Sequence, residues 1–170
     1  MLRRFAYLIP VMALFLLPAI SRAQFEAGNW ELTLSAHGTA NRDFKGTPET
    51  AASGNLGLGY FLTKELEVGV RQGIVWSDGG SSWSGDTRGA LDWHFDFDRL
   101  WPFIGINAGY IYHSSGSGAN DHWAGGPEAG LKYFLNSTTF VEADISYEFD
   151  LQERISQGSW VYGVALGVKF

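Results

Sequence analysis

Residues 160–170 read WVYGVALGVKF, and this closing stretch decides the fold. Large apolar residues alternate with small or polar ones at period two, which is typical of a β-strand with two different faces. One face carries Trp160, Tyr162, Val164, Leu166, Val168 and Phe170, and the other carries Val161, Gly163, Ala165, Gly167 and Lys169. Soluble domains more often end in a few polar, disordered residues. We therefore expect another strand to pair with this one.

The opposite end of the chain predicts export. Arg3 and Arg4 precede an apolar run over residues 6–20, and Ser21-Arg22-Ala23 places small residues where a signal peptidase reads the chain. The run is shorter than the roughly 17–25 residues that a spanning helix needs. No cysteine follows, which excludes a lipoprotein anchor. We predict a signal peptide over residues 1–23 and a single mature domain over residues 24–170.

The composition of the mature chain excludes several classes of protein and favours a β-rich fold. Loss of the three arginines of the signal peptide changes the formal net charge from −6 to −9, which gives no support to a nucleic-acid partner. The absence of cysteine excludes a disulfide framework. The 22 glycines and 15% aromatic residues favour strands over helices. No uncharged apolar run after Gln24 approaches the roughly 18 residues of a transmembrane helix.

Period-two alternation recurs along the whole mature chain. Besides residues 160–170, it covers 30–36, 55–62, 65–76, 87–95, 103–112, 127–134 and 140–149. These eight segments have about the 9–11 residues with which a tilted strand crosses a bilayer.

The segments between them alternate in length. The long connections are 37–51, 77–85, 113–123 and 150–159, and the short ones are 62–64, 96–100 and 135–138. Membrane barrels have short periplasmic turns and longer extracellular loops. We therefore predict an all-β fold, an eight-stranded up-and-down antiparallel transmembrane β-barrel over residues 24–170.

The alternation leaves open which face lies inside the barrel, and aromatic residues help to decide. They gather near both ends of the segments, as two girdles at the two membrane interfaces would require. The turn-side set is Tyr60, Phe61, Trp93, Phe95, Tyr133, Phe134 and Phe170, and the loop-side set is Trp76, Trp83, Tyr112, Trp123, Phe149 and Trp160. Glycine lies mainly on the charged face, which suits a tightly curved interior. We predict that the apolar face meets lipid.

The charged face would then form a polar network in the lumen. Its predicted members are Glu31, Glu67, Arg71, Arg88, Asp92, Glu128, Lys132, Glu142, Asp144 and Glu148, and Lys169 lies on the same face. Buried charges must be paired, so one interpretation is an ion-pair plug. Acids outnumber bases, so the alternative is a water path that favours cations, as in a small porin-like channel.

Three stretches carry a family resemblance: GYFLTKELEVGV (59–70), GPEAGLKYFLNSTTFVEADISYEF (126–149) and VYGVALGVKF (161–170). They resemble the small outer-membrane β-barrel proteins of Gram-negative bacteria, the OmpA/OmpX-like superfamily. The resemblance implies location in the cell outer membrane and a structural or surface-interaction role. It also implies that outer-membrane lipid, lipopolysaccharide and the barrel assembly machinery are partners. That machinery would read a C-terminal signal, which Tyr162, Val164, Leu166, Val168 and Phe170 match. The extracellular ligand stays unknown.

Residues 112–123, YHSSGSGANDHW, carry the best candidates for chemistry. His113 and Ser115 form an H-x-S, and lipid A deacylase barrels use such a pair. That family carries it in the penultimate strand region, however, and here that region reads DISYEFDLQERISQG, without histidine. His113, Asp121 and His122 have no recognised metal-ligand spacing. We therefore predict no catalytic, cofactor-binding or metal-binding residue, and a lipid A-modifying enzyme is the least favoured alternative.

Overall fold

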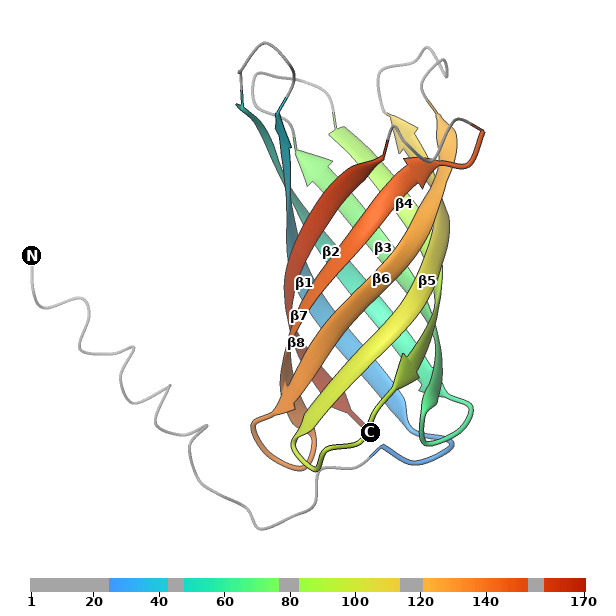
Figure 1. Ribbon diagram of the computed structural model, residues 1–170, viewed down its shortest axis with the longest axis vertical. Coiled ribbons are helices and arrows are strands. Elements are labelled where there is room, and N and C mark those ends of the chain that lie inside the picture. Colours follow the sequence, from blue (N-terminus) through green and yellow to red (C-terminus); the bar gives the residue numbers. More distant parts are fainter. Residues whose placement is uncertain (1–24, 43–47, 77–82, 114–120, 153–157) are drawn as a thin grey trace, which may run out of the picture.

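Eight antiparallel strands close into one up-and-down barrel in the computed structural model (Figure 1). The structure describes residues 25–42, 48–76, 83–113, 121–152 and 158–170. The strands are β1 (Trp30–Arg42), β2 (Pro48–Phe61), β3 (Leu66–Trp76), β4 (Trp83–His94), β5 (Leu100–His113), β6 (His122–Phe134), β7 (Thr139–Asp150) and β8 (Ser159–Lys169). The predicted fold class is confirmed. The predicted signal peptide, residues 1–23, lies outside the described residues. In the described part of the chain, no helix has the length and apolarity to cross a membrane.

Strand β8 closes the barrel by pairing with β1. Their register places Leu34 opposite Leu166. Trp30 and Phe170 exchange two backbone hydrogen bonds of 2.9 Å at the turn end of this seam. Closure leaves no open sheet edge, which hydrocarbon would not tolerate because it offers no partners for backbone N–H and C=O groups. The strand-like character of residues 160–170 therefore follows from their place in the barrel wall.

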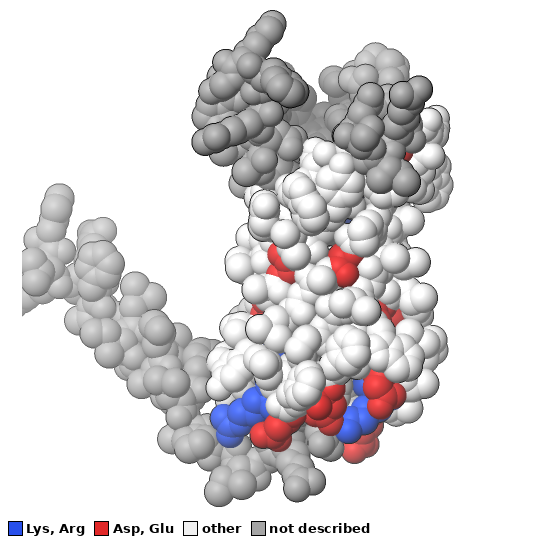
Figure 2. All heavy atoms as spheres, viewed as in Figure 1, with Lys and Arg blue, Asp and Glu red and all other residues white. Residues whose placement is uncertain are grey.

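The two faces of the wall are inverted relative to a soluble protein. Outward apolar side chains are exposed, for example Leu34 at 67%, Val164 at 62% and Ile106 at 60%, whereas inward Glu31 and Asp92 are buried. Figure 2 shows charged side chains gathered near the turn end of this side of the molecule, below a wide and mainly uncharged band. A wide surface of exposed apolar side chains is typical of membrane contact.

Several strands extend further into the predicted loops than the alternation indicated. Strand β1 continues to Arg42 and β2 begins at Pro48, within the predicted connection 37–51, and these two strands reach far toward the loop end (Figure 1). Strand β4 likewise begins at Trp83, within the predicted connection 77–85. The reason is that backbone pairing persists beyond the lipid-facing band, whereas apolar alternation is required only within it.

The short turns are fixed by side chains that accept backbone hydrogen bonds. In the β2–β3 turn, Thr63 Oγ1 accepts the N–H of Leu66 at 3.0 Å. In the β6–β7 turn, Asn136 Oδ1 accepts the N–H of Thr139 at 2.8 Å. Thr and Asn favour turns for this reason. The predicted short connections lie at one end of the barrel, because consecutive antiparallel strands are joined alternately at its two ends.

Glycine on the inner face leaves room for the long charged side chains. A Cβ atom at Gly59 would collide with the Glu67 carboxylate, and one at Gly163 would collide with Asp144 and the ring of His37. The interior of an eight-stranded barrel is only wide enough for side chains to fill it. These glycines therefore allow the polar network to assemble.

Gly126 provides a test of wall packing. A Cβ atom there would overlap the backbone carbonyl oxygen of Tyr147 on β7, whereas at the outward Gly89 the nearest atoms lie 4.0 Å away. We expect Gly126→Ala to destabilise the barrel by about 1–3 kcal/mol through overpacking. The control Gly89→Ala should be neutral or stabilise by up to about 1 kcal/mol. Urea unfolding in phospholipid vesicles would measure both, and equal stabilities would contradict the expected backbone collision.

Candidate functional site in the barrel lumen

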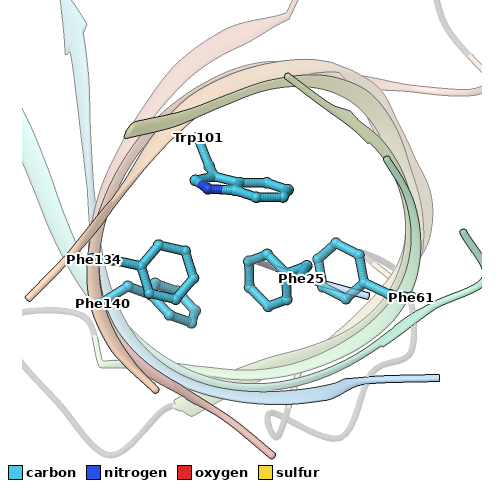
Figure 3. Packing of buried hydrophobic residues seen from close by; sticks show 5 residues of the cluster. All are labelled: Phe25, Phe61, Trp101, Phe134 and Phe140. Atoms are coloured by element: carbon cyan, nitrogen blue, oxygen red, sulfur yellow. The ribbon is translucent and has the colours of Figure 1, made fainter. Parts of the chain in front are cut away.

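The turn end of the lumen is filled by five aromatic side chains, which we call the aromatic floor. They are Phe25, Phe61, Trp101, Phe134 and Phe140, and all are fully buried (Figure 3). Phe25 precedes β1 and stacks on Phe61, with ring centroids 3.9 Å apart and planes at 13°. Its ring also meets Trp101 and Phe134 edge-on, each at 5.2 Å. The chain segment before β1 thus contributes the central ring of this floor.

Two residues of the predicted turn-side girdle lie in the aromatic floor and not on the outer surface. Phe61 and Phe134 were expected at the outer interface, and this prediction is wrong because both side chains are buried inside the barrel. Each directly follows a tyrosine, and neighbouring residues of a strand point to opposite faces. Tyr133 is accordingly exposed on the outside. On the loop side, the side chains of Trp76 and Trp83 lie outside the described set.

Three members of the floor were not identified by the sequence analysis. Phe140 lies two residues before Glu142 on the inward face of β7, within a predicted strand. Trp101 continues the inward series of β5 two residues before Phe103, so extending the period-two pattern by one step would have found it. Phe25 lies outside every alternating segment, and no local pattern marks it.

Lys132 lies directly beside the floor, enclosed by carboxylates. Its Nζ atom lies 2.6 Å from Glu31 Oε2, 2.9 Å from Glu67 Oε2 and 3.8 Å from Glu142 Oε2. The same ammonium lies 5.2 Å from the ring centre of Phe140, within cation–π range. Fully buried His94 contacts this cluster through Nε2, which lies 2.8 Å from Glu67 Oε2.

Two arginines hold the next group of carboxylates. Arg71 on β3 and Arg88 on β4 are direct partners in the strand register, a placement that like charges disfavour. Each one is compensated by its own carboxylate pair. Arg71 lies 2.7 Å from Glu128 and 3.1 Å from Asp92, and Arg88 lies 2.6 Å from Glu148 and also contacts Asp86.

Asp144 has a different environment nearer the loop end. Its Oδ2 atom lies 3.5 Å from Nε2 of His37, and the amide of Asn55 contacts Nδ1 of the same imidazole. When Nδ1 accepts the hydrogen bond from Asn55 Nδ2, the ring carries its proton on Nε2 and is neutral. Asp144 then has a neutral partner where the other carboxylates have cationic ones.

Cavities remain between these groups, and two of them are lined by members of the network. The upper one, toward the loop end, has a volume of about 120 Å³, and Asn55, Arg88, Asp144 and Glu148 are among its lining residues. The lower one, lined by Glu31, Glu67 and Arg71 among others, has a volume of about 10 Å³. A cavity needs at least roughly 10–15 Å³ of this kind to hold one water molecule. The lower lumen is therefore nearly filled by side chains.

All ten residues of the predicted lumen network take part in these contacts. Lys132 gathers Glu31, Glu67 and Glu142, the two arginines gather Asp92, Glu128 and Glu148, and Asp144 contacts His37. The sequence analysis missed Asp86, His94, His37 and Asn107. Asp86 lies two residues before Arg88 on the inward face, so the same alternation extended past the predicted strand end would have found it.

The predicted C-terminal signal lies on the outer face. Its five residues, Tyr162, Val164, Leu166, Val168 and Phe170, are all exposed along β8 and just beyond it. Their role in assembly stays a prediction.

The candidates for chemistry in the loop region are only partly described. His113 Nδ1 lies 3.4 Å from Asp121 Oδ1, which also accepts the backbone N–H of His113 at 2.9 Å. Ser115 lies outside the described residues. Among the residues that the structure describes, no group of three or more His, Cys, Asp or Glu side chains is arranged to hold a metal ion.

Comparison with known proteins gives similarity to outer-membrane barrels, although no family model matches the chain. Outer membrane porin F of Pseudomonas aeruginosa is 25% identical over an alignment of 130 residues, and the match covers 66% of this chain. The chain spans about 37% of the length of this curated relative. The crystal structure of the N-terminal β-barrel domain of Pseudomonas aeruginosa OprF superposes with a TM-score of 0.61 at 22% identity, covering 86% of this chain and 100% of that domain. Neisserial surface protein A superposes with a TM-score of 0.62 at 15% identity, covering 84% of this chain and 96% of that protein.

These similarities agree with the inverted faces of the wall. The chain is an eight-stranded β-barrel of the Gram-negative outer membrane, as the sequence resemblance implied. The identities are too low to carry over what any of these proteins binds or conducts.

Proposed function

We propose that this outer-membrane barrel is a sealed structural protein that makes surface contacts at its loop end. The observation that carries the proposal is the filling of the lumen from the turn end upward. The aromatic floor is fully buried, and Lys132 and its three carboxylates lie immediately beside it. An ion would have to displace apolar rings and separate buried ion pairs, both of which cost free energy.

Membrane lipid is the first partner that we propose. The exposed apolar residues of the outer face would contact acyl chains, and aromatic side chains such as Trp93 and Trp160 would lie near the two interfaces. Lipopolysaccharide in the outer leaflet would contact the loop end. The barrel assembly machinery would recognise the exposed side chains of β8.

A planar-bilayer recording of the purified, refolded barrel tests the seal. Because the lower lumen has almost no free volume, we expect no discrete current steps from protein whose folding is verified by its heat-dependent electrophoretic mobility. Reproducible steps of one size would contradict a sealed barrel.

A small cation-favouring channel is the second candidate function. It is favoured by the excess of acidic side chains among the described interior residues. Seven carboxylates pair with Arg71, Arg88 and Lys132, and Asp144 pairs with His37. The curated relative is moreover named a porin. If current steps are observed, Glu142→Gln and Asp144→Asn should reduce both the conductance and the cation preference. Unchanged selectivity in both variants would count against this candidate as well.

A further inference from the structure

One carboxylate in the upper cavity lacks a cationic partner. Of the four acidic side chains that line this cavity, Asp86, Glu128 and Glu148 each pair with an arginine. Among the residues that the structure describes, Asp144 forms an ion-pair contact only with the imidazole of His37, and that ring is neutral when its Nδ1 accepts the hydrogen bond from Asn55. Asp86 and Glu148 share Arg88, and Glu128 shares Arg71 with Asp92. The lining therefore carries an excess of negative charge, and Asp144 is its one carboxylate without an arginine partner.

The environment of Asp144 makes this charge costly. Its side chain is only 9% exposed, and its Oδ1 atom is buried without a hydrogen-bond partner. Gly163, its partner in the register of β8, has no side chain that could contact this carboxylate. Burial of an unpaired carboxylate is strongly unfavourable. A positive charge in the adjoining cavity of about 120 Å³ would remove this cost.

The chemistry of the wall indicates which cation fits. Among the described residues, no group of three or more His, Cys, Asp or Glu side chains is arranged to hold a chelated metal ion. Lys132 shows instead that this interior holds an ammonium group, with Nζ between Glu31 and Glu67. An ammonium carries three N–H donors on a compact charge, which suits carboxylate and amide oxygens that are spread around a cavity.

We propose that the upper cavity binds a small primary ammonium compound whose charged nitrogen pairs with Asp144. The inference goes beyond the sealed-barrel role and does not depend on it, because a cavity closed below and a channel open below would both present Asp144 to the ligand.

Isothermal titration of the refolded barrel with methylammonium and with 1,4-diaminobutane tests the site, with sodium chloride at matched ionic strength as the reference. Wild-type protein should bind at least one of the amines saturably. Asp144→Asn, which keeps the shape and removes the charge, should weaken binding by about tenfold or more, since charge-assisted hydrogen bonds are the strong ones. The control Glu65→Gln removes the same charge from the β2–β3 turn and should leave binding unchanged.

Three results would overturn the proposal. The first is equal binding by wild type and Asp144→Asn, and the second is binding heat that disappears against matched sodium chloride. The third is an NMR spectrum of the free barrel at neutral pH in which the His37 imidazole is fully protonated, since Asp144 would then already have its cation. Electrophoretic mobility of each variant establishes that it is folded before titration.

Discussion

Replacement of Lys132 with methionine is expected to destabilise the barrel by about 3–5 kcal/mol. Methionine matches the length and apolar stem of lysine but removes the ammonium. Glu31 and Glu67, whose oxygens lie 2.6 and 2.9 Å from Nζ, would then remain buried without their cation. Glu142 would lose its more distant partner at 3.8 Å. The cost arises mainly from the carboxylates left behind, because breaking a buried pair leaves an uncompensated charge.

Lys64→Met is the matched control for this variant. Lys64 also forms an ion pair, with Asp96 at 2.6 Å, but its side chain is 39% exposed at the turn end. Exposed pairs contribute about 0–1 kcal/mol because water solvates both partners and the pair is screened. Urea unfolding in phospholipid vesicles, followed by tryptophan fluorescence, would compare the two variants. Similar losses in both would show that burial does not set the strength of the Lys132 cluster.

Replacement of Trp101 with alanine is expected to cost about 3–5 kcal/mol by opening a cavity in the aromatic floor. Trp101 is fully buried, and its ring lies edge-on to Phe25 at 5.2 Å. Its indole N–H also donates to the backbone oxygen of Asp98 at 2.8 Å, which ties the floor to the β4–β5 turn. Asp98 is the one non-glycine residue with positive φ, at 65°, among those described.

Trp101→Phe separates packing from hydrogen bonding at this position. Phenylalanine keeps most of the ring contact with Phe25 but cannot donate to Asp98. We expect it to lose about 1–2 kcal/mol, the combined effect of one hydrogen bond and a smaller cavity. The same unfolding measurement applies. A loss in Trp101→Phe equal to that in Trp101→Ala would show that the turn contact, and not the packing of the floor, carries the stabilisation.

The groups that close the lumen are also those expected to stabilise it. Lys132 and Trp101 lie in the lower half of the barrel, where almost no free volume remains, whereas Asp144 lies beside the larger upper cavity. Variants of Lys132 and Trp101 should therefore change stability, and Asp144→Asn should mainly change ligand binding. This division allows the sealed-barrel proposal and the ammonium site to fail separately.

The sequence by itself determined the eight strands, the closed barrel and the inward face of the charged residues. The strands follow from period-two alternation, which arises from the geometry of each strand and needs no knowledge of distant residues. The barrel follows from the alternating lengths of the connections, and the inward face from the positions of the aromatic residues and glycines. The same rule explains the local errors. Phe61 and Phe134 follow outward tyrosines and must point inward, and Asp86 continues the inward series beyond the predicted strand end.

Only the tertiary structure decided which charges meet across the lumen. Lys132 and Glu31 are 101 residues apart in the chain, and Arg71 and Glu128 are 57 apart. Phe25, which precedes the first strand, lies at the centre of the aromatic floor and stacks on Phe61. Asp144 forms its ion-pair contact with His37. Local alternation fixes the face of a side chain, but its level and its partner depend on how the strands are staggered when the barrel closes.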